Sequence, residues 1–363
     1  MSNARKLADN LPTEGQLGNR NLLYNGKHEV AQRGTSFSSA GNVIYLTDRW
    51  HIPIGSSFNL DTTLSQSTTV PTGQGFKYSL KVEADTVQTP SGSHNGGIAQ
   101  KLEGQDVQHL AYGTSSAKSV TLSFWVRSNK TGVYCCQLQT NHYGGSSQYG
   151  HVKEYTISAA NTWEKKILTF PGLTAQTIDT VTGDGLRVLW WLACGSTDHV
   201  SADSWIQSAS YAATSNQVNF MDSASNEWYL TGCQLEEGSQ ASPFEHEQYS
   251  VTLAKCQRYA YVFKTDNTNG IINIHQDRLT QGYIGNIIMP VEMRTAPTVT
   301  HVGMDRVHKP GIRYDTISSG PAFSFIHTQG FVTTMTAATN DVDSQTAYFG
   351  AVSGGTITAD AEL

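Results

Sequence analysis

A polar, glycine-rich segment at positions 141–149 gathers side chains that could bind a ligand. His142, Tyr143, Gln148 and Tyr149 place an imidazole, two phenol rings and an amide on a permissive backbone. Sugar rings present apolar C–H faces, so their binding sites combine an aromatic platform with a few polar groups that fix orientation. These four residues are therefore candidate glycan ligands. The alternative is an ordinary hairpin loop, because surface loops are commonly polar.

A second candidate lies at the end of a predicted strand, where Asp48, Arg49 and Trp50 combine charge with an aromatic ring. We interpret them as further glycan ligands for the same chemical reason. The alternative is structural: Trp50 fills the edge of the fold while Arg49 pairs with Asp48, because the large apolar body of a tryptophan usually ends up mostly buried.

Sequence motifs of catalysis are missing. The chain contains no His-Glu-x-x-His zinc helix, no phosphate-binding loop with its lysine and no Gly-x-Ser-x-Gly nucleophile elbow. We therefore predict that the protein is not an enzyme and uses no cofactor. A glycosidase stays open as an alternative, since its two carboxylates can lie far apart in the chain.

Two pairs of aspartates are the candidates for a structural calcium ion. Asp341 with Asp343, and Asp198 with Asp203, could supply carboxylate oxygens from loops, which calcium prefers. Neither pair has the Gly and Glu of a full calcium loop. The twelve histidines lack the i, i+3 or i, i+4 spacing of helical metal sites. We therefore predict no metal ligands, with a structural calcium left open.

Composition excludes several functions. A formal net charge of −6 and a pI near 6.0 give no basic footprint for a nucleic acid. No apolar run approaches the roughly 20 residues of a membrane span, and positions 1–20 lack the apolar core of a signal peptide. The sequence therefore predicts a soluble chain made in a cytoplasm, with no nucleic-acid partner and no membrane insertion.

The five cysteines argue against a disulfide framework, because their number is odd and four lie in apolar, strand-like runs. Cys135 and Cys136 are neighbours in one such run and would point to opposite faces of a strand, so they cannot chelate a metal together. Buried free thiols are the expected state.

Alternating apolar and polar residues predict many short strands. In 76–82, apolar Phe76 and Leu80 alternate with mostly charged residues, and in 120–126 the apolar residues alternate with an outward-facing set that includes Trp125. Glycine- and serine-rich loops separate these runs. The sequence therefore predicts an all-β fold whose main body is a two-sheet jelly-roll β-sandwich.

A polar linker at 236–247 separates two predicted modules. After it, Ser250 can cap a short helix that continues to about Phe263, and a further set of strands follows. We predict three parts: a short N-terminal arm at 1–20, the jelly-roll domain at 21–247, and a smaller β-domain at 248–363 that opens with the helix.

The arm carries apolar residues at helical spacing, among them Leu7 and Leu11. A stretch this short is not stable alone, so it needs a partner surface. We interpret it as an assembly arm that docks on a neighbouring subunit. The alternative is a disordered terminus.

Several motifs resemble those of bacteriophage tail-fibre and related virion proteins. The joint between the two modules reads QLEEG at 234–238, SPFE at 242–245 and CQRY at 256–259. The opening phrase of that family is similar to GNRNLLYNG at 18–26, VAQRGTS at 30–36 and YLTDRW at 45–50, and its later part to PVEMRTAPTV at 290–299 and ADAEL at 359–363. Positions 21–26 also resemble the first strand of jelly-roll carbohydrate-binding modules.

The resemblance implies a virion component, most simply a short homotrimeric tail fibre that binds a host surface polysaccharide without cleaving it. Its other partners would be tail or capsid proteins of the particle, and it would be made in the host cytoplasm. Carbohydrate-binding modules sometimes hold a structural calcium, but Lys27 and His28 stand where they often carry acidic or small residues. Two alternatives stay open: a capsid- or tail-attached decoration protein without a receptor role, and a polysaccharide depolymerase.

Overall fold

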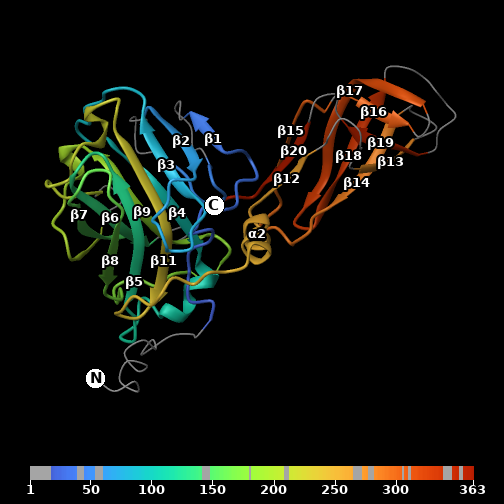
Figure 1. Cartoon of the computed structure of the whole chain (residues 1–363). Coiled ribbons are helices and arrows are strands. Elements are labelled where there is room, and N and C mark those ends of the chain that lie inside the picture. Colours follow the sequence, from blue (N-terminus) through green and yellow to red (C-terminus); the bar gives the residue numbers. More distant parts are fainter. Residues whose placement is uncertain are drawn as a thin grey trace. The chain divides into compact units, whose positions relative to one another are not determined.

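The structure is a computed structural model and describes residues 18–38, 45–53, 60–140, 148–179, 181–207, 212–264, 272–276, 282–304, 306–309, 312–337, 346–350 and 355–363 (Figure 1). Its internal contacts divide the chain into two units, Met1–Thr252 together with Leu363, and Leu253–Glu362. The sequence prediction placed the boundary between these modules at positions 247 and 248.

The first unit is a sandwich of two antiparallel sheets within the described ranges (Figure 1). One sheet has the order β1 (Ser36–Ser38), β2 (Thr62–Ser67), β3 (Ser79–Ala84), β11 (Glu227–Glu237), β5 (Val120–Ser128) and β8 (Glu164–Phe170). The other has the order β10 (Trp205–Gln207), β7 (Tyr149–Ile157), β6 (Gly132–Thr140), β9 (Asp184–Cys194) and β4 (Asn95–Glu103). The described part of this unit also contains the 3-10 helices η1 (Gly104–Leu110), η2 (Ser196–Asp198) and η3 (Phe220–Asp222).

Strand alternation builds the core between the two sheets. Leu122, Phe124 and Val126 of β5 are fully buried, and the ring of Phe124 meets that of Trp190 from β9 at 5.6 Å between centroids. The residues that alternate with them lie on the opposite face of the sheet, where Ser123 is buried while Trp125 and Arg127 keep some exposure. The period of two therefore assigns one face of β5 to the core between the sheets and places Trp125 on the other face.

The second unit contains a three-stranded sheet and a closed barrel among its described residues. The sheet has the order β12 (Ala260–Lys264), β20 (Thr356–Asp360) and β15 (Thr298–Val302). The barrel has the order β13 (Ile272–Gln276), β14 (Gly282–Ile288), β18 (Gly330–Ala337), β17 (Ile312–His327), β16 (Arg306–Lys309) and β19 (Thr346–Gly350). The core of this unit includes Met289, Met293, Met304 and Met335, whose flexible side chains fill irregular space.

The predicted fold class is confirmed: the chain is all-β, with a jelly-roll sandwich, a short helix and a second, smaller β-domain. One detail is wrong. Helix α2 spans Tyr249–Gln257 and does not continue to Phe263, because Ala260–Lys264 pairs antiparallel with β20 as strand β12. Tyr261 and Val262 belong to residue types that favour strands, so strand pairing prevails over the helical spacing.

Among the described residues, no helix combines the length and hydrophobicity that crossing a lipid bilayer requires.

Candidate functional site

A cluster of buried polar side chains gives the QLEEG and SPFE motifs their structure. Both carboxylate oxygens of Glu236 accept hydrogen bonds from Ser242, one from its backbone N–H at 2.8 Å and one from its hydroxyl at 2.6 Å. The amide of Gln234 donates to Glu236 at 3.0 Å and accepts the backbone N–H of Glu245 at 2.8 Å. These bonds tie the segment after β11 back onto β11 itself.

Glu245 fastens the same segment to the start of the sandwich. Its carboxylate accepts the backbone N–H groups of Asn19, Arg20 and Asn21 at 2.8, 2.7 and 3.1 Å. Hydrogen bonds to a charged acceptor are the stronger kind. Residues 241–246 are therefore held in place from both sides, and they form one wall of a pocket.

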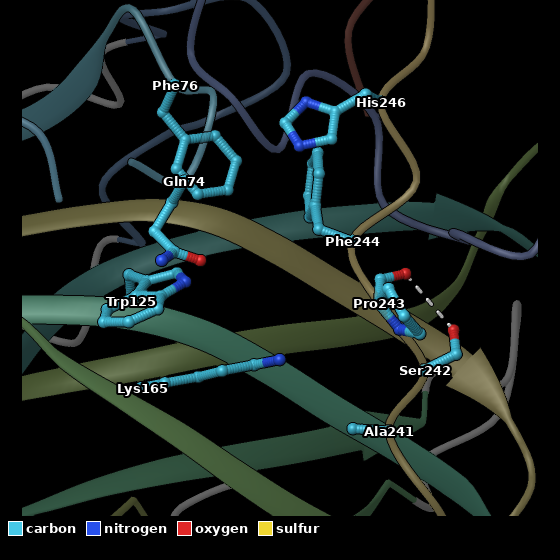
Figure 2. Close-up of a pocket in the computed structure, with 9 residues that line it drawn as sticks. All are labelled: Gln74, Phe76, Trp125, Lys165, Ala241, Ser242, Pro243, Phe244 and His246. Carbon is cyan, nitrogen blue, oxygen red and sulfur yellow. Dashed lines mark hydrogen bonds between the residues drawn. The ribbon is translucent and has the colours of Figure 1, made fainter. Parts of the chain in front are cut away.

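The pocket has a volume of about 420 Å³ and opens beside the outer face of strands β5 and β8 (Figure 2). This volume falls within the range of roughly 300–1,000 Å³ that small-molecule sites occupy. Its nine lining residues come from three places: the loop before β3, the two strands, and the segment after β11. They are Gln74, Phe76, Trp125, Lys165, Ala241, Ser242, Pro243, Phe244 and His246.

Gly232 of β11 leaves space for two aromatic side chains that line the pocket, Phe76 and Trp125. Gly232 has φ +62°, a left-handed conformation that favours glycine, and it lies where the pairing register between β11 and β5 shifts. A Cβ atom at this position would come within 2.6 Å of the Phe76 ring and 3.1 Å of the Trp125 indole. The bulge therefore lets both rings pack against the bare backbone of β11.

Three rings form the aromatic wall. Phe76 meets Phe244 edge-on at 5.1 Å between centroids and meets His246 at 5.3 Å, while Phe244 and His246 are 5.0 Å apart. Edge-to-face pairs at such distances are favourable. The pKa of His246 lies below its ordinary value, chiefly because partial burial disfavours the charged ring and secondly because positive Lys27 is near. At neutral pH the imidazole is therefore an uncharged member of this wall.

The polar side chains of the pocket complement that wall. Trp125 of β5 and Lys165 of β8 are directly opposed across the two strands, so both side chains leave the same face of the sheet. Figure 2 shows Gln74, Trp125 and Lys165 directed into the same space. An indole face, an amide and an ammonium group thus border one cavity, which is the composition of a site for a polar ring with an apolar face.

The structure corrects one predicted site. Asp48, Arg49 and Trp50 have exposed fractions of 0%, 1% and 0%, so they offer no surface to a glycan. The Asp48 carboxylate accepts the backbone N–H of Gln32 at 3.1 Å, Arg49 donates to the Lys101 carbonyl at 2.6 Å, and Trp50 donates to the Asn25 carbonyl at 3.1 Å. Their role is to hold the edge of the sandwich, as buried polar groups must be hydrogen-bonded.

The other predicted glycan ligands divide between described and undescribed residues. Gln148 and Tyr149 are half-buried: the Gln148 amide oxygen accepts from Gln139 at 3.4 Å, and the Tyr149 hydroxyl donates to Gln207 at 3.3 Å. His142 and Tyr143 lie outside the described residues, as do Leu7 and Leu11 of the arm and the pair Asp341 and Asp343. Gln148 and Tyr149 do not line the pocket, and the predictions made for all these residues stay predictions.

A calcium ion does not fit the segment that resembles carbohydrate-binding modules. The Asn21 side-chain oxygen already accepts the N–H groups of Leu23 and Leu235, and that of Asn25 accepts the N–H of Val30. Within the described part of the chain, no three His, Cys, Asp or Glu side chains cluster so that they could hold a metal ion. The oxygens that could bind calcium here serve the backbone instead.

Sequence reasoning missed the pocket because its walls come from distant positions. The one signal it had was Trp125, an outward-facing tryptophan on a strand whose other face is core. Nothing in the local sequence shows that Phe244 and His246 lie beside it.

No known family profile and no curated protein matches the sequence. Solved structures with a similar fold include carbohydrate-binding domains and a phage tailspike domain. The enzymatically active domain of tailspike protein 4 from bacteriophage CBA120 is 11% identical, with a TM-score of 0.34 over 60% of this chain and 21% of that chain. This chain therefore spans about a fifth of the tailspike chain's length.

Two carbohydrate-binding domains are covered almost completely. A xylan-binding domain from Paenibacillus barcinonensis is 13% identical, with a TM-score of 0.31 over 56% of this chain and 98% of that chain. A family 11 carbohydrate-binding module from Clostridium thermocellum, in complex with a mixed-linked tetrasaccharide, is 14% identical, with a TM-score of 0.27 over 58% of this chain and 97% of that chain. All three similarities are distant in both sequence and backbone.

Proposed function

We propose that the first unit binds a glycan in the pocket of Trp125, without cleaving it. The observation that carries this proposal is the partly exposed indole of Trp125, which borders a cavity of about 420 Å³ together with the ends of Gln74 and Lys165. The indole offers its face to the C–H side of a sugar ring, and the amide and ammonium groups can hydrogen-bond the hydroxyls.

Preorganisation supports the same function. The wall at 241–246 is fixed by the hydrogen bonds of Glu236 and Glu245, and Phe76 is packed against Gly232. A site that is already ordered loses less conformational entropy when it binds a ligand. The ordered wall should therefore raise the affinity for a glycan, and several copies on one particle would add avidity.

The chemistry of the described lining supports binding without cleavage. Glycoside hydrolysis uses a pair of carboxyl groups that flank the scissile bond. The nine lining residues include no Asp or Glu. The described lining therefore lacks the carboxyl pair that this reaction uses.

The test is a glycan array with the purified full chain, followed by calorimetric titration of the best ligand. Trp125→Ala should weaken binding about tenfold or more, because about 1.4 kcal/mol corresponds to a factor of ten. Trp163→Ala is the matched control, since Trp163 contacts Tyr229 on the same sheet and does not line the pocket. Retention of full affinity by Trp125→Ala, with native circular dichroism, would exclude the pocket as the site.

The proposed biological setting is a virion. The resemblance of the QLEEG, SPFE and CQRY motifs to tail-fibre proteins supports a short homotrimeric fibre that is attached by the arm at Leu7 and Leu11 and binds host surface polysaccharide. Light scattering should give three times the monomer mass of 39.5 kDa, and labelled particles should carry the protein at the tail in electron micrographs. A monomer in solution would remove the trimer from the proposal, and a label only on the capsid would favour the decoration role.

A further inference from the structure

We propose that the glycan held at this pocket is acidic, and that one of its rings carries a carboxylate that pairs with Lys165 while the ring stacks on Trp125. This inference rests on the proposed glycan binding and names the class of sugar. A uronic acid residue fits the description, because its carboxylate is bonded directly to the ring.

The described residues that line the pocket carry a positive charge and no negative charge. Among its nine residues, Lys165 is the single side chain with a formal charge at neutral pH, and Asp and Glu are absent from it. Lys165 is exposed, and it follows Glu164 and precedes Lys166 on strand β8. Those two neighbours pair with each other at 2.6 Å. Because side chains alternate along a strand, this ion pair lies on the face opposite Lys165.

Carboxylates close to the pocket wall are engaged elsewhere. Glu236 is 2% exposed and accepts two hydrogen bonds from Ser242. Glu245 accepts three backbone N–H groups at the start of the sandwich. Glu29, which lies near His246, forms an ion pair with Lys27 at 2.8 Å. Since these carboxylates of the described residues are engaged, we expect the carboxylate that complements Lys165 to come with the ligand.

The short distance between Trp125 and Lys165 favours a carboxylate on the same sugar ring that stacks on the indole. Directly opposed residues on antiparallel strands have Cβ atoms about 4.5–5.5 Å apart, and Trp125 and Lys165 are such a pair. A sugar ring on the indole therefore places a substituent at its rim next to the ammonium group. Gln74 remains free to bond a hydroxyl, since an amide both donates and accepts.

The test compares each acidic oligosaccharide with its own methyl ester, which keeps the stereochemistry and removes the charge. Oligogalacturonate, oligoglucuronate and oligomannuronate are titrated into the full chain at low salt, each as the free acid and as the ester. For at least one pair the free acid should bind about three- to fivefold more tightly, the effect of one partly exposed ion pair. The difference should shrink in 0.3 M salt, because screening weakens exposed pairs.

Two variants assign the effect to a residue. Lys165→Gln should make the acid and its ester bind equally, because it removes the charge that distinguishes them. Lys166→Gln is the matched control, since it removes a positive charge from the opposite face of the same strand, and it should preserve the preference. Equal binding of acid and ester by the unaltered chain, or an equal loss of preference in both variants, would overturn the inference.

The outcomes separate this inference from the function on which it rests. If neutral glycans bind through Trp125 and no acid is preferred, the glycan site stands and its acidic specificity fails. If no glycan of either kind binds, the proposed function fails too. Dextran sulfate is measured alongside, and a gain over dextran as large as that of the uronates would show a general preference for anions and overturn the carboxylate assignment.

Discussion

The backbone of Gly232 lies directly against the ring of Phe76: a Cβ atom added at position 232 would stand 2.6 Å from the ring's Cζ atom. Real Cβ contacts are not this short, so either the ring or the strand would have to move. Because Phe76 also packs against Phe244 and His246, a movement of this ring would disturb the whole aromatic wall of the pocket.

We therefore expect Gly232→Ala to lower both stability and glycan affinity. The left-handed backbone costs an alanine about 1 kcal/mol, and overpacking adds about 1–3 kcal/mol. Gly73→Ala is the matched control, because Gly73 has φ +75° and nothing within 4 Å of its added Cβ. All seven tryptophans lie in the first unit, so their fluorescence during urea unfolding measures this unit. Equal losses in the two variants would mean that the Phe76 contact is unimportant.

Glu245→Ala should destabilise the first unit by about 2 kcal/mol, because it leaves the N–H groups of Asn19, Arg20 and Asn21 without their charged acceptor. Glu245→Gln keeps an acceptor oxygen and should lose roughly half as much. Glu83→Ala is the control: it removes a carboxylate from a surface ion pair, which contributes about 0–1 kcal/mol. Urea midpoints that are the same for Glu245→Ala and Glu83→Ala would contradict the proposed role of Glu245.

Acid should destabilise the first unit through its buried histidines. Burial lowers the pKa of His151 from 6.5 to about 4 and that of His28 to about 3. The folded state therefore favours the neutral rings, so their stabilising contribution is complete above pH 6.5 and is lost as the pH falls towards 4.

His151→Phe tests this pH dependence. The ring of His151 lies edge-on between Phe170 and Trp205 at 5.4 and 5.3 Å, so a phenyl ring suits the site. The variant should gain on the order of 2 kcal/mol relative to the unaltered chain between pH 7 and pH 4.5. Parallel curves of unfolding free energy against pH would show that His151 does not titrate on unfolding.

The cysteines should be inert in the folded protein. Cys135, Cys136 and Cys233 are fully buried and burial raises the pKa of each thiol, while half-buried Cys194 has its pKa raised to about 12, chiefly by burial and secondly by Asp198. At pH 8 a thiol with this pKa is roughly one part in ten thousand thiolate, the reactive form. Ellman's reagent should label no thiol rapidly under native conditions and all five cysteines in guanidinium. Rapid labelling of the native protein would contradict this burial.

Local pattern predicted the sandwich well where one face of a strand meets the core. Leu122 and Phe124 lie in the core and Trp125 lies on the other face with some exposure, because successive side chains point to opposite faces. Local pattern failed for Asp48, Arg49 and Trp50, since charge and aromaticity indicate what a side chain can bind and not whether the folded chain covers it.

Sequence alone determined the all-β class, the outward direction of Trp125 and the position of the polar segment after β11, because each depends on the period of a strand or on residues a few positions apart. Tertiary structure decided that Trp125, Lys165 and Phe244 share one cavity. Their proximity depends on the strand order, on the bulge at Gly232 and on the hydrogen bonds that Glu245 accepts from residues more than 220 positions away. Such long-range pairings are set by the packing of the whole sandwich, and no local pattern encodes them.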